Sequence, residues 1–121
     1  MTLTAEAILD AFSHIPEIPQ TNLYYDSETE SCCGLTAIVL ANCDDPDLCR
    51  KDLAEADPDM QKLYLYQEMK EIMPELSRED LDIFIFGWDD LLGIEGPITK
   101  NSMYTAAFSA RKELCDLSDP R

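Results

Sequence analysis

Basic residues are scarce in this sequence. Its 121 residues contain nine Lys and Arg and one His, against 25 Asp and Glu, which gives a formal net charge of −16. A charge of this sign and size repels nucleic acids and anionic membranes, and it attracts basic surfaces. The shortage of cations therefore argues against direct binding of nucleic acid and makes basic proteins the natural class of partner.

Long apolar runs are also lacking. No segment approaches the ~20 consecutive apolar residues that a membrane-spanning helix needs. The first residues, MTLTAEAILDAF, include no positive charge and carry two acids, which is unlike a secretory signal. We therefore expect a cytoplasmic protein without membrane association, in which a reducing environment keeps the five cysteines as thiols.

Patterns that hold metal ions are missing as well. There is no C-x-x-C pair, and a helix would hold Cys32 and Cys43 about 16 Å apart. Cys43 and Cys49 can approach each other across an Asp-Pro turn, but two thiols are half of a zinc site. The acidic stretch 43–59 has no central glycine and no D-x-D-x-D-G order, as a calcium loop requires. We expect no metal and no cofactor, and the cysteines to pack as small apolar residues.

Catalytic constellations are equally absent. Cys32 and Cys33 precede an expected helix, where a helix dipole lowers the pKa of a thiol. A cysteine nucleophile also needs a base, and the only histidine, His14, lies before both cysteines. No Ser-His-Asp order and no phosphate-binding glycine loop occurs. We therefore expect that the protein is not an enzyme.

Helix signals, in contrast, are plentiful. The pairs Asp45-Pro46 and Asp57-Pro58 each place an N-cap aspartate before a proline at the first helical position. They predict helices over about 46–56 and 58–73. The expected inner stripes are Leu48, Cys49, Leu53 and Ala56 in the first helix and Met60, Leu63, Tyr64 and Ile72 in the second.

Four further helices follow from capping residues and apolar spacing. A capping box, Ser27-x-x-Glu30, ahead of the apolar run 32–43 predicts a central helix. Gly34 within it suggests close packing against a neighbour. The other expected helices cover about 4–15, 78–92 after a Ser77-x-x-Asp80 capping box, and 102–117. Together they predict an all-α fold, a compact single-domain bundle of about six short helices over residues 1–121.

The acidic residues are unevenly distributed. Residues 26–95 contain 19 acids and 5 bases, whereas residues 96–121 contain 3 acids and 4 bases. Helix starts explain four of the seven carboxylates in the stretch 43–59. Since duplex DNA carries one charge per ~1.7 Å of its axis, rows of carboxylates on helices can offer a comparable density to a basic groove.

From this charge we expect a non-enzymatic inhibitor or decoy that binds a basic nucleic-acid-binding protein and blocks access of nucleic acid. Phage proteins against restriction or CRISPR systems and immunity proteins against nuclease toxins use this strategy, and the sequence does not distinguish them. Tyrosines among acids are suited to arginine-rich partners. The expected partner-binding residues are Asp44, Asp45, Asp47, Asp57, Asp59, Asp89, Asp90, Tyr24 and Tyr25.

The alternative is a helical adaptor or assembly protein that binds through an apolar groove, with acidity serving only solubility. An exposed patch that includes Leu91, Leu92 and Ile94, or Tyr24 and Tyr25, would favour it. This alternative also leaves a homodimer open.

Overall fold

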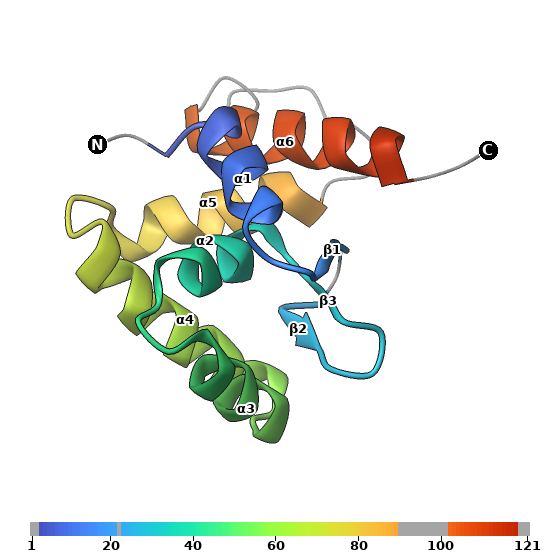
Figure 1. Ribbon diagram of the computed structural model, residues 1–121. Coiled ribbons are helices and arrows are strands. Elements are labelled where there is room, and N and C mark those ends of the chain that lie inside the picture. The colour runs from blue at the N-terminus through green and yellow to red at the C-terminus, as the bar shows by residue number, and fades with distance from the viewer. Residues whose placement is uncertain (1–2, 22, 90–101, 119–121) are drawn as a thin grey trace.

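The computed structural model of the protein describes residues 3–21, 23–89 and 102–118 (Figure 1). In these ranges the chain forms six helices and one small sheet of three strands. The predicted all-α class is confirmed. The helices are α1 (Ala5–Ser13), α2 (Gly34–Asn42), α3 (Pro46–Glu55), α4 (Pro58–Ile72), α5 (Arg78–Asp89) and α6 (Ser102–Ser118), and the strands are β1 (Ile18–Pro19), β2 (Tyr25–Asp26) and β3 (Ser31–Cys32).

The predicted helix starts are confirmed at three helices. The Asp45 side chain accepts a hydrogen bond from the Leu48 amide at 3.2 Å, and Asp57 caps α4 in the same way at 2.9 Å. Ser77 and Asp80 form a reciprocal capping box, with distances of 2.9 and 3.1 Å. These bonds satisfy amides that have no partner within the helix, which fixes where the helices begin.

The predicted capping box at Ser27 is wrong. Residues 27–30 form the turn between β2 and β3, in which the Asp26 carboxylate accepts from the Glu28 amide at 2.9 Å. The central helix starts only at Gly34. The two prolines of segment 16–25 prevent a helix there, and its backbone groups must pair elsewhere. They pair with β3, which lies parallel to β1 and antiparallel to β2.

Helix α2 lies at the centre of the bundle and contacts all five other helices that the structure describes (Figure 1). Its residues 34–40 are all buried. A Cβ atom at Gly34 would lie 2.9 Å from the indole ring of Trp88, so the predicted close packing at this glycine is confirmed. Trp88 is fully buried, and its Nε1 donates to the Gln20 carbonyl at 2.8 Å. This bond ties α5 to the segment that carries β1.

The predicted inner stripes of α3 and α4 are partly wrong. Leu48, Met60 and Leu63 are about half exposed, at 54%, 53% and 48%. The side chains of α4 that are buried are Gln61, Leu65 and Met69, which recur every four residues. Apolar residues lie on two sides of α4, so periodicity alone does not determine which side meets α2. The rotation leaves an apolar face of α4 uncovered.

Candidate partner-binding surfaces

Ten carboxylates lie on or beside three segments that contact one another, namely α3, the start of α4, and β2 with the turn after it (Figure 1). We call this region the acidic end. Helix α3 contacts β2, and the Gln61 amide of α4 donates to the carbonyls of Leu53 and Tyr25 at 2.7 and 3.4 Å. Its acids are Asp26, Glu28, Glu30, Asp44, Asp45, Asp47, Asp52, Glu55, Asp57 and Asp59, and its bases are Arg50 and Lys51.

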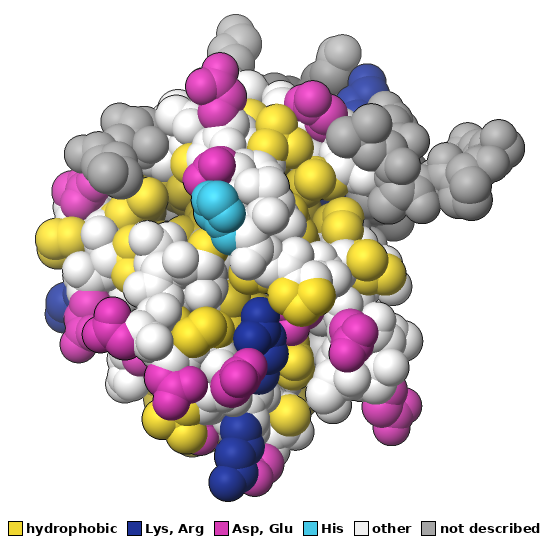
Figure 2. All heavy atoms as spheres, in the orientation of Figure 1, with side chains coloured by type: hydrophobic (Ala, Val, Ile, Leu, Met, Phe, Trp, Pro, Cys, Tyr) yellow, Lys and Arg dark blue, Asp and Glu magenta, His cyan; other side chains and the backbone are white. Residues whose placement is uncertain are grey.

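Five of the predicted partner-binding aspartates belong to the acidic end, and all five side chains are exposed: Asp44, Asp45, Asp47, Asp57 and Asp59. Two of them cap helices and one pairs with a neighbouring arginine, so part of their charge serves the fold. Figure 2 shows acidic side chains as separate spots with apolar side chains between them, on the face that it presents. A partner would meet a mixed acidic and apolar surface.

An internal carboxylate engages one of the two bases of the acidic end. Glu17, which is 5% exposed, accepts from Arg50 Nε at 2.7 Å and from Nη2 at 3.1 Å. Arg50 also binds the exposed Asp47 at 2.9 Å. The hydrogen bonds to Glu17 are the main reason that the pKa of Arg50 is raised. Since both carboxylates belong to the chain itself, Arg50 offsets little of the charge that a partner would meet.

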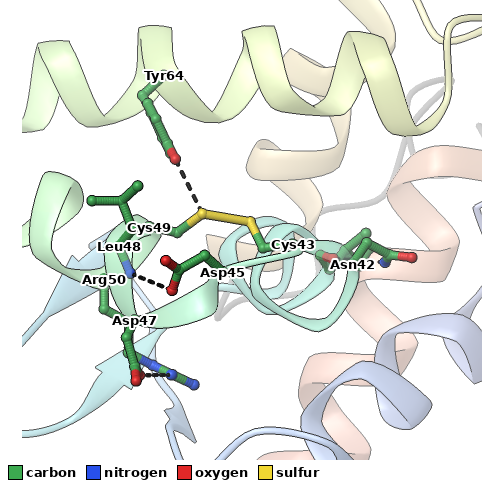
Figure 3. Close-up of a disulfide and its surroundings, with 9 residues drawn as sticks. Asn42, Cys43, Asp45, Asp47, Leu48, Cys49, Arg50 and Tyr64 are labelled. Atoms are coloured by element: carbon green, nitrogen blue, oxygen red, sulfur yellow. Dashed lines mark hydrogen bonds and ion pairs between the residues drawn. A yellow bond between two sulfur atoms is a disulfide. The ribbon is translucent and has the colours of Figure 1, made fainter.

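A disulfide joins Cys43, just after α2, to Cys49 in α3 (Figure 3). The expectation that these cysteines are thiols is therefore wrong in this structure. The Tyr64 hydroxyl of α4 donates to Cys49 Sγ at 3.2 Å, so the bridge also contacts a third helix. Figure 3 shows Asp45 beside the bridge and Asp47 farther from it, paired with Arg50. The disulfide thus fixes the start of α3, where the predicted aspartates are densest.

A second candidate surface is a hollow of about 460 Å³, which we call the tyrosine hollow. Three predicted partner-binding residues line it: Tyr24, Tyr25 and Asp89. All three side chains are half-buried. Burial, with further contributions from Cys33 and Asp89, raises the pKa of Tyr24 to about 12. Burial also raises the pKa of Tyr25. The tyrosines therefore keep their protons, and neither is the fully exposed anchor that the sequence left open. The other lining residues are Leu23, Asp26, Cys33, Pro58, Gln61 and Ile85.

Two further thiols, Cys32 and Cys33, do not resemble reactive groups. Cys32 and Cys33 are both buried, and burial raises the pKa of each. Cys33 Sγ lies 3.4 Å from Thr36 Oγ1, within the core. Among the described residues no three His, Cys, Asp or Glu side chains gather as metal ligands. In the same part of the chain, no helix has both the length and the apolar character needed to cross a membrane.

A groove of about 660 Å³ runs between α4 and the segment from Pro74 to Leu81. We call it the basic-rimmed groove, because Lys62, Lys70 and Arg78 line it. Its other lining residues are Asp59, Met60, Leu63, Tyr66, Gln67, Pro74, Leu76, Ser77 and Leu81. The sequence gives no sign of this groove, because apolar spacing places Met60 and Leu63 on the expected inner stripe of α4.

Some predicted residues cannot be placed. Asp90, Leu91, Leu92 and Ile94 lie outside the described residues. Glu17 binds Arg50 of the acidic end although it lies 33 residues earlier in the chain. The sequence around Glu17 has no pattern that distinguishes a buried, paired glutamate from an exposed one. Comparisons with protein-family models, with curated proteins and with solved structures found no match for this chain.

Proposed function

We propose that the protein is a non-enzymatic inhibitor that places its acidic end against a basic, nucleic-acid-binding surface and keeps nucleic acid away from it. The observation that carries the proposal is that ten carboxylates lie on or beside α3, the start of α4, and β2 with its turn, which contact one another. Of the two bases in that region, Arg50 already binds Glu17 and Asp47.

The charge density supports this proposal. Helix α3 has ten residues and is about 15 Å long. The same length of duplex DNA carries about nine phosphate charges. Helix α3 with the two aspartates before it carries five carboxylates, about half of that density, and the other five carboxylates of the acidic end lie on the adjacent segments. The arrangement is less regular than a phosphate backbone, and apolar side chains such as Leu48 lie between the acids. Attraction would come from the charge, and apolar contacts would add specificity.

The rigidity of the acidic end supports it too. The Asp45 cap and the Glu17–Arg50 pair hold α3 in place, and both act whether Cys43 and Cys49 are bridged or reduced. A surface that is ordered before binding loses less conformational entropy when a partner docks. Inhibitors of restriction enzymes or CRISPR effectors, and immunity proteins for nuclease toxins, are the classes that would use such a surface. All of them would act in the cytoplasm.

The disulfide is relevant to the proposed cytoplasmic location, because stable disulfides are uncommon in reducing compartments. Alkylation of thiols at lysis, followed by mass spectrometry of the peptide that holds Cys43 and Cys49, measures their state in the cell. A reduced pair would agree with a cytoplasmic inhibitor, whereas an intact bridge would indicate an oxidising compartment and a target found there.

The test is a pull-down from nuclease-treated lysate with the wild type and two charge-reversed variants. One variant carries Asp44→Lys, Asp52→Lys and Glu55→Lys at the acidic end. The control carries Glu6→Lys, Asp10→Lys and Glu113→Lys on α1 and α6, which changes net charge equally. All six side chains are exposed.

We expect the wild type and the control to retain a basic nucleic-acid-binding protein, which moderate salt or added DNA releases. The acidic-end variant should retain none. Equal retention by the acidic-end variant, or a complex that persists in high salt, would contradict the proposal.

A second candidate function, a helical adaptor, is favoured by one separate observation. The basic-rimmed groove exposes Met60 and Leu63 on a face that no described element covers.

A further inference from the structure

The basic-rimmed groove has the shape of a docking site for one helix. Its α4 wall runs from Asp59 to Lys70, which corresponds to about 16 Å at 1.5 Å per residue. Met60 and Leu63 are about half exposed along this wall. Leu76 and the buried Leu81 contribute apolar surface from the opposite side. Three turns of a helix, with apolar residues at i, i+4 and i+7, would fill this length.

The side chains that line the groove carry a net positive charge, unlike the protein as a whole. Lys62, Lys70 and Arg78 are three of the nine basic residues in the whole chain, and a single carboxylate, Asp59, lines the groove with them. This local excess of positive charge would attract carboxylates. It makes the groove unsuited to the basic partner proposed for the acidic end.

Two of these three cations are available to a ligand. Lys62 lies 3.6 Å from Asp82, and its ammonium group sits 5.4 Å from the centre of the Tyr66 ring. Tyr66 in turn donates to Asp82 at 2.6 Å, which holds this corner in place. In the described part of the chain, no carboxylate lies within ion-pair distance of Lys70 or Arg78, and both side chains are exposed. They can bind carboxylates on an incoming segment.

We propose that the basic-rimmed groove binds an acidic amphipathic helix of another protein, with three apolar side chains against Met60, Leu63 and Leu76 and with carboxylates facing Lys70 and Arg78. The inference goes beyond the proposed inhibitor, because it uses a different face and the opposite charge. If both surfaces are used, the protein links a basic partner to an acidic one.

A second copy of the chain fits the groove less well. Its acidic end would match the charge, but α3 offers Leu48 as its exposed large apolar side chain. One apolar contact would leave most of the apolar surface of the groove uncovered. A separate amphipathic helix supplies apolar residues and carboxylates together.

The test uses a designed 14-residue peptide with Leu at i, i+4 and i+7 and Glu at the flanking positions. Control peptides replace Glu with Lys or Leu with Ser. Each is titrated into the isotope-labelled full chain and followed by NMR. We expect saturable shifts confined to the residues that line the groove with the Glu peptide, and at least tenfold weaker binding of both controls.

Protein variants locate the site. Lys70→Glu with Arg78→Glu should weaken binding of the Glu peptide at least tenfold and improve binding of the Lys peptide. Lys51→Glu with Lys112→Glu, at exposed bases away from the groove, should leave both affinities unchanged. Leu63→Asp should abolish binding without lowering the melting temperature.

Three results would overturn the inference. They are absence of saturable binding at millimolar peptide, shifts that map outside the groove, and equal affinity for the Glu and Lys peptides. Sedimentation at several protein concentrations tests the other possible occupant of the groove, a second copy of the chain, because it measures self-association. Self-association that Leu63→Asp removes would assign the groove to a second copy instead.

Discussion

The acidic end and the basic-rimmed groove share helix α4 but are built in different ways. The acidic end draws nine of its ten carboxylates from exposed positions in three neighbouring segments, and local capping bonds fix most of its geometry. The groove depends on how α4 is rotated against α2 and on where α5, the next helix in the chain, packs. A charged surface can therefore be recognised from sequence, whereas an apolar groove needs the packing of helices to be known.

The largest expected effect tests the rotation of α4, which separates the two regions. Leu65 is fully buried, whereas Leu63, two residues away, faces the groove. Leu65→Ala should lower the free energy of unfolding by about 3 kcal/mol. Leu63→Ala should change it by less than about 0.5 kcal/mol. Urea denaturation of the two variants measures both values, and equal losses would show that the groove face is packed in solution.

The next effect concerns what holds the acidic end in place. Glu17→Ala would leave the guanidinium group of Arg50 without its buried partner. Removing one partner of a fully buried pair costs about 3–5 kcal/mol. Because Arg50 retains some exposure, we expect a loss of about 2–3 kcal/mol in the free energy of unfolding.

Asp47→Ala is the matched control, because it removes the other partner of Arg50 at a side chain that is 93% exposed. Exposed ion pairs contribute about 0–1 kcal/mol. Similar losses for Glu17→Ala and Asp47→Ala in urea denaturation would mean that the internal pair does not order the acidic end.

The disulfide should have a somewhat smaller effect. Cys43 and Cys49 are six residues apart, and loop-closure entropy for so short a loop corresponds to about 2 kcal/mol. The variant with both Cys43→Ser and Cys49→Ser should unfold at lower urea by this amount. Reductant should lower the stability of the wild type equally and leave the variant unchanged. An effect of reductant on the variant would point to one of the three other cysteines, Cys32, Cys33 or Cys115, instead.

The features that could be predicted are those that local chemistry determines. Aspartate followed by proline marks the starts of α3 and α4 unambiguously, because cap and proline act within one turn. The capping-box pattern at Ser27 failed, because its neighbours in the chain pair with β1 and make a strand of residues 31–32. Backbone pairing between residues 13 positions apart in the sequence therefore outweighed the local preference for a helix start.

The candidate sites follow the same rule. The aspartates of the acidic end could be named in advance because they are contiguous with helix starts. Glu17 and the basic-rimmed groove could not, since they depend on contacts between residues far apart in the sequence. Tyr24 and Asp89 were proposed separately, and only packing of α5 against the segment before α2 brings them together.

The smallest effect at neutral pH is expected at the tyrosine hollow, which adjoins the acidic end through Asp26 and Pro58. The folded state holds the pKa of Tyr24 at about 12, against about 10 in the unfolded chain. The folded form therefore resists loss of the phenolic proton. Its contribution to stability is fully present below pH 10 and is lost as the pH rises towards 12.

Ultraviolet titration of the phenolate in the wild type and in Tyr24→Phe isolates this group. The difference between the two curves should have its midpoint near pH 12, and Tyr24→Phe should lose less stability than the wild type between pH 10 and 12. A midpoint near pH 10 would mean that Tyr24 is exposed to water in solution. Tyr24 would then be free to contact a partner, and it would belong to the acidic end rather than to a separate tyrosine hollow.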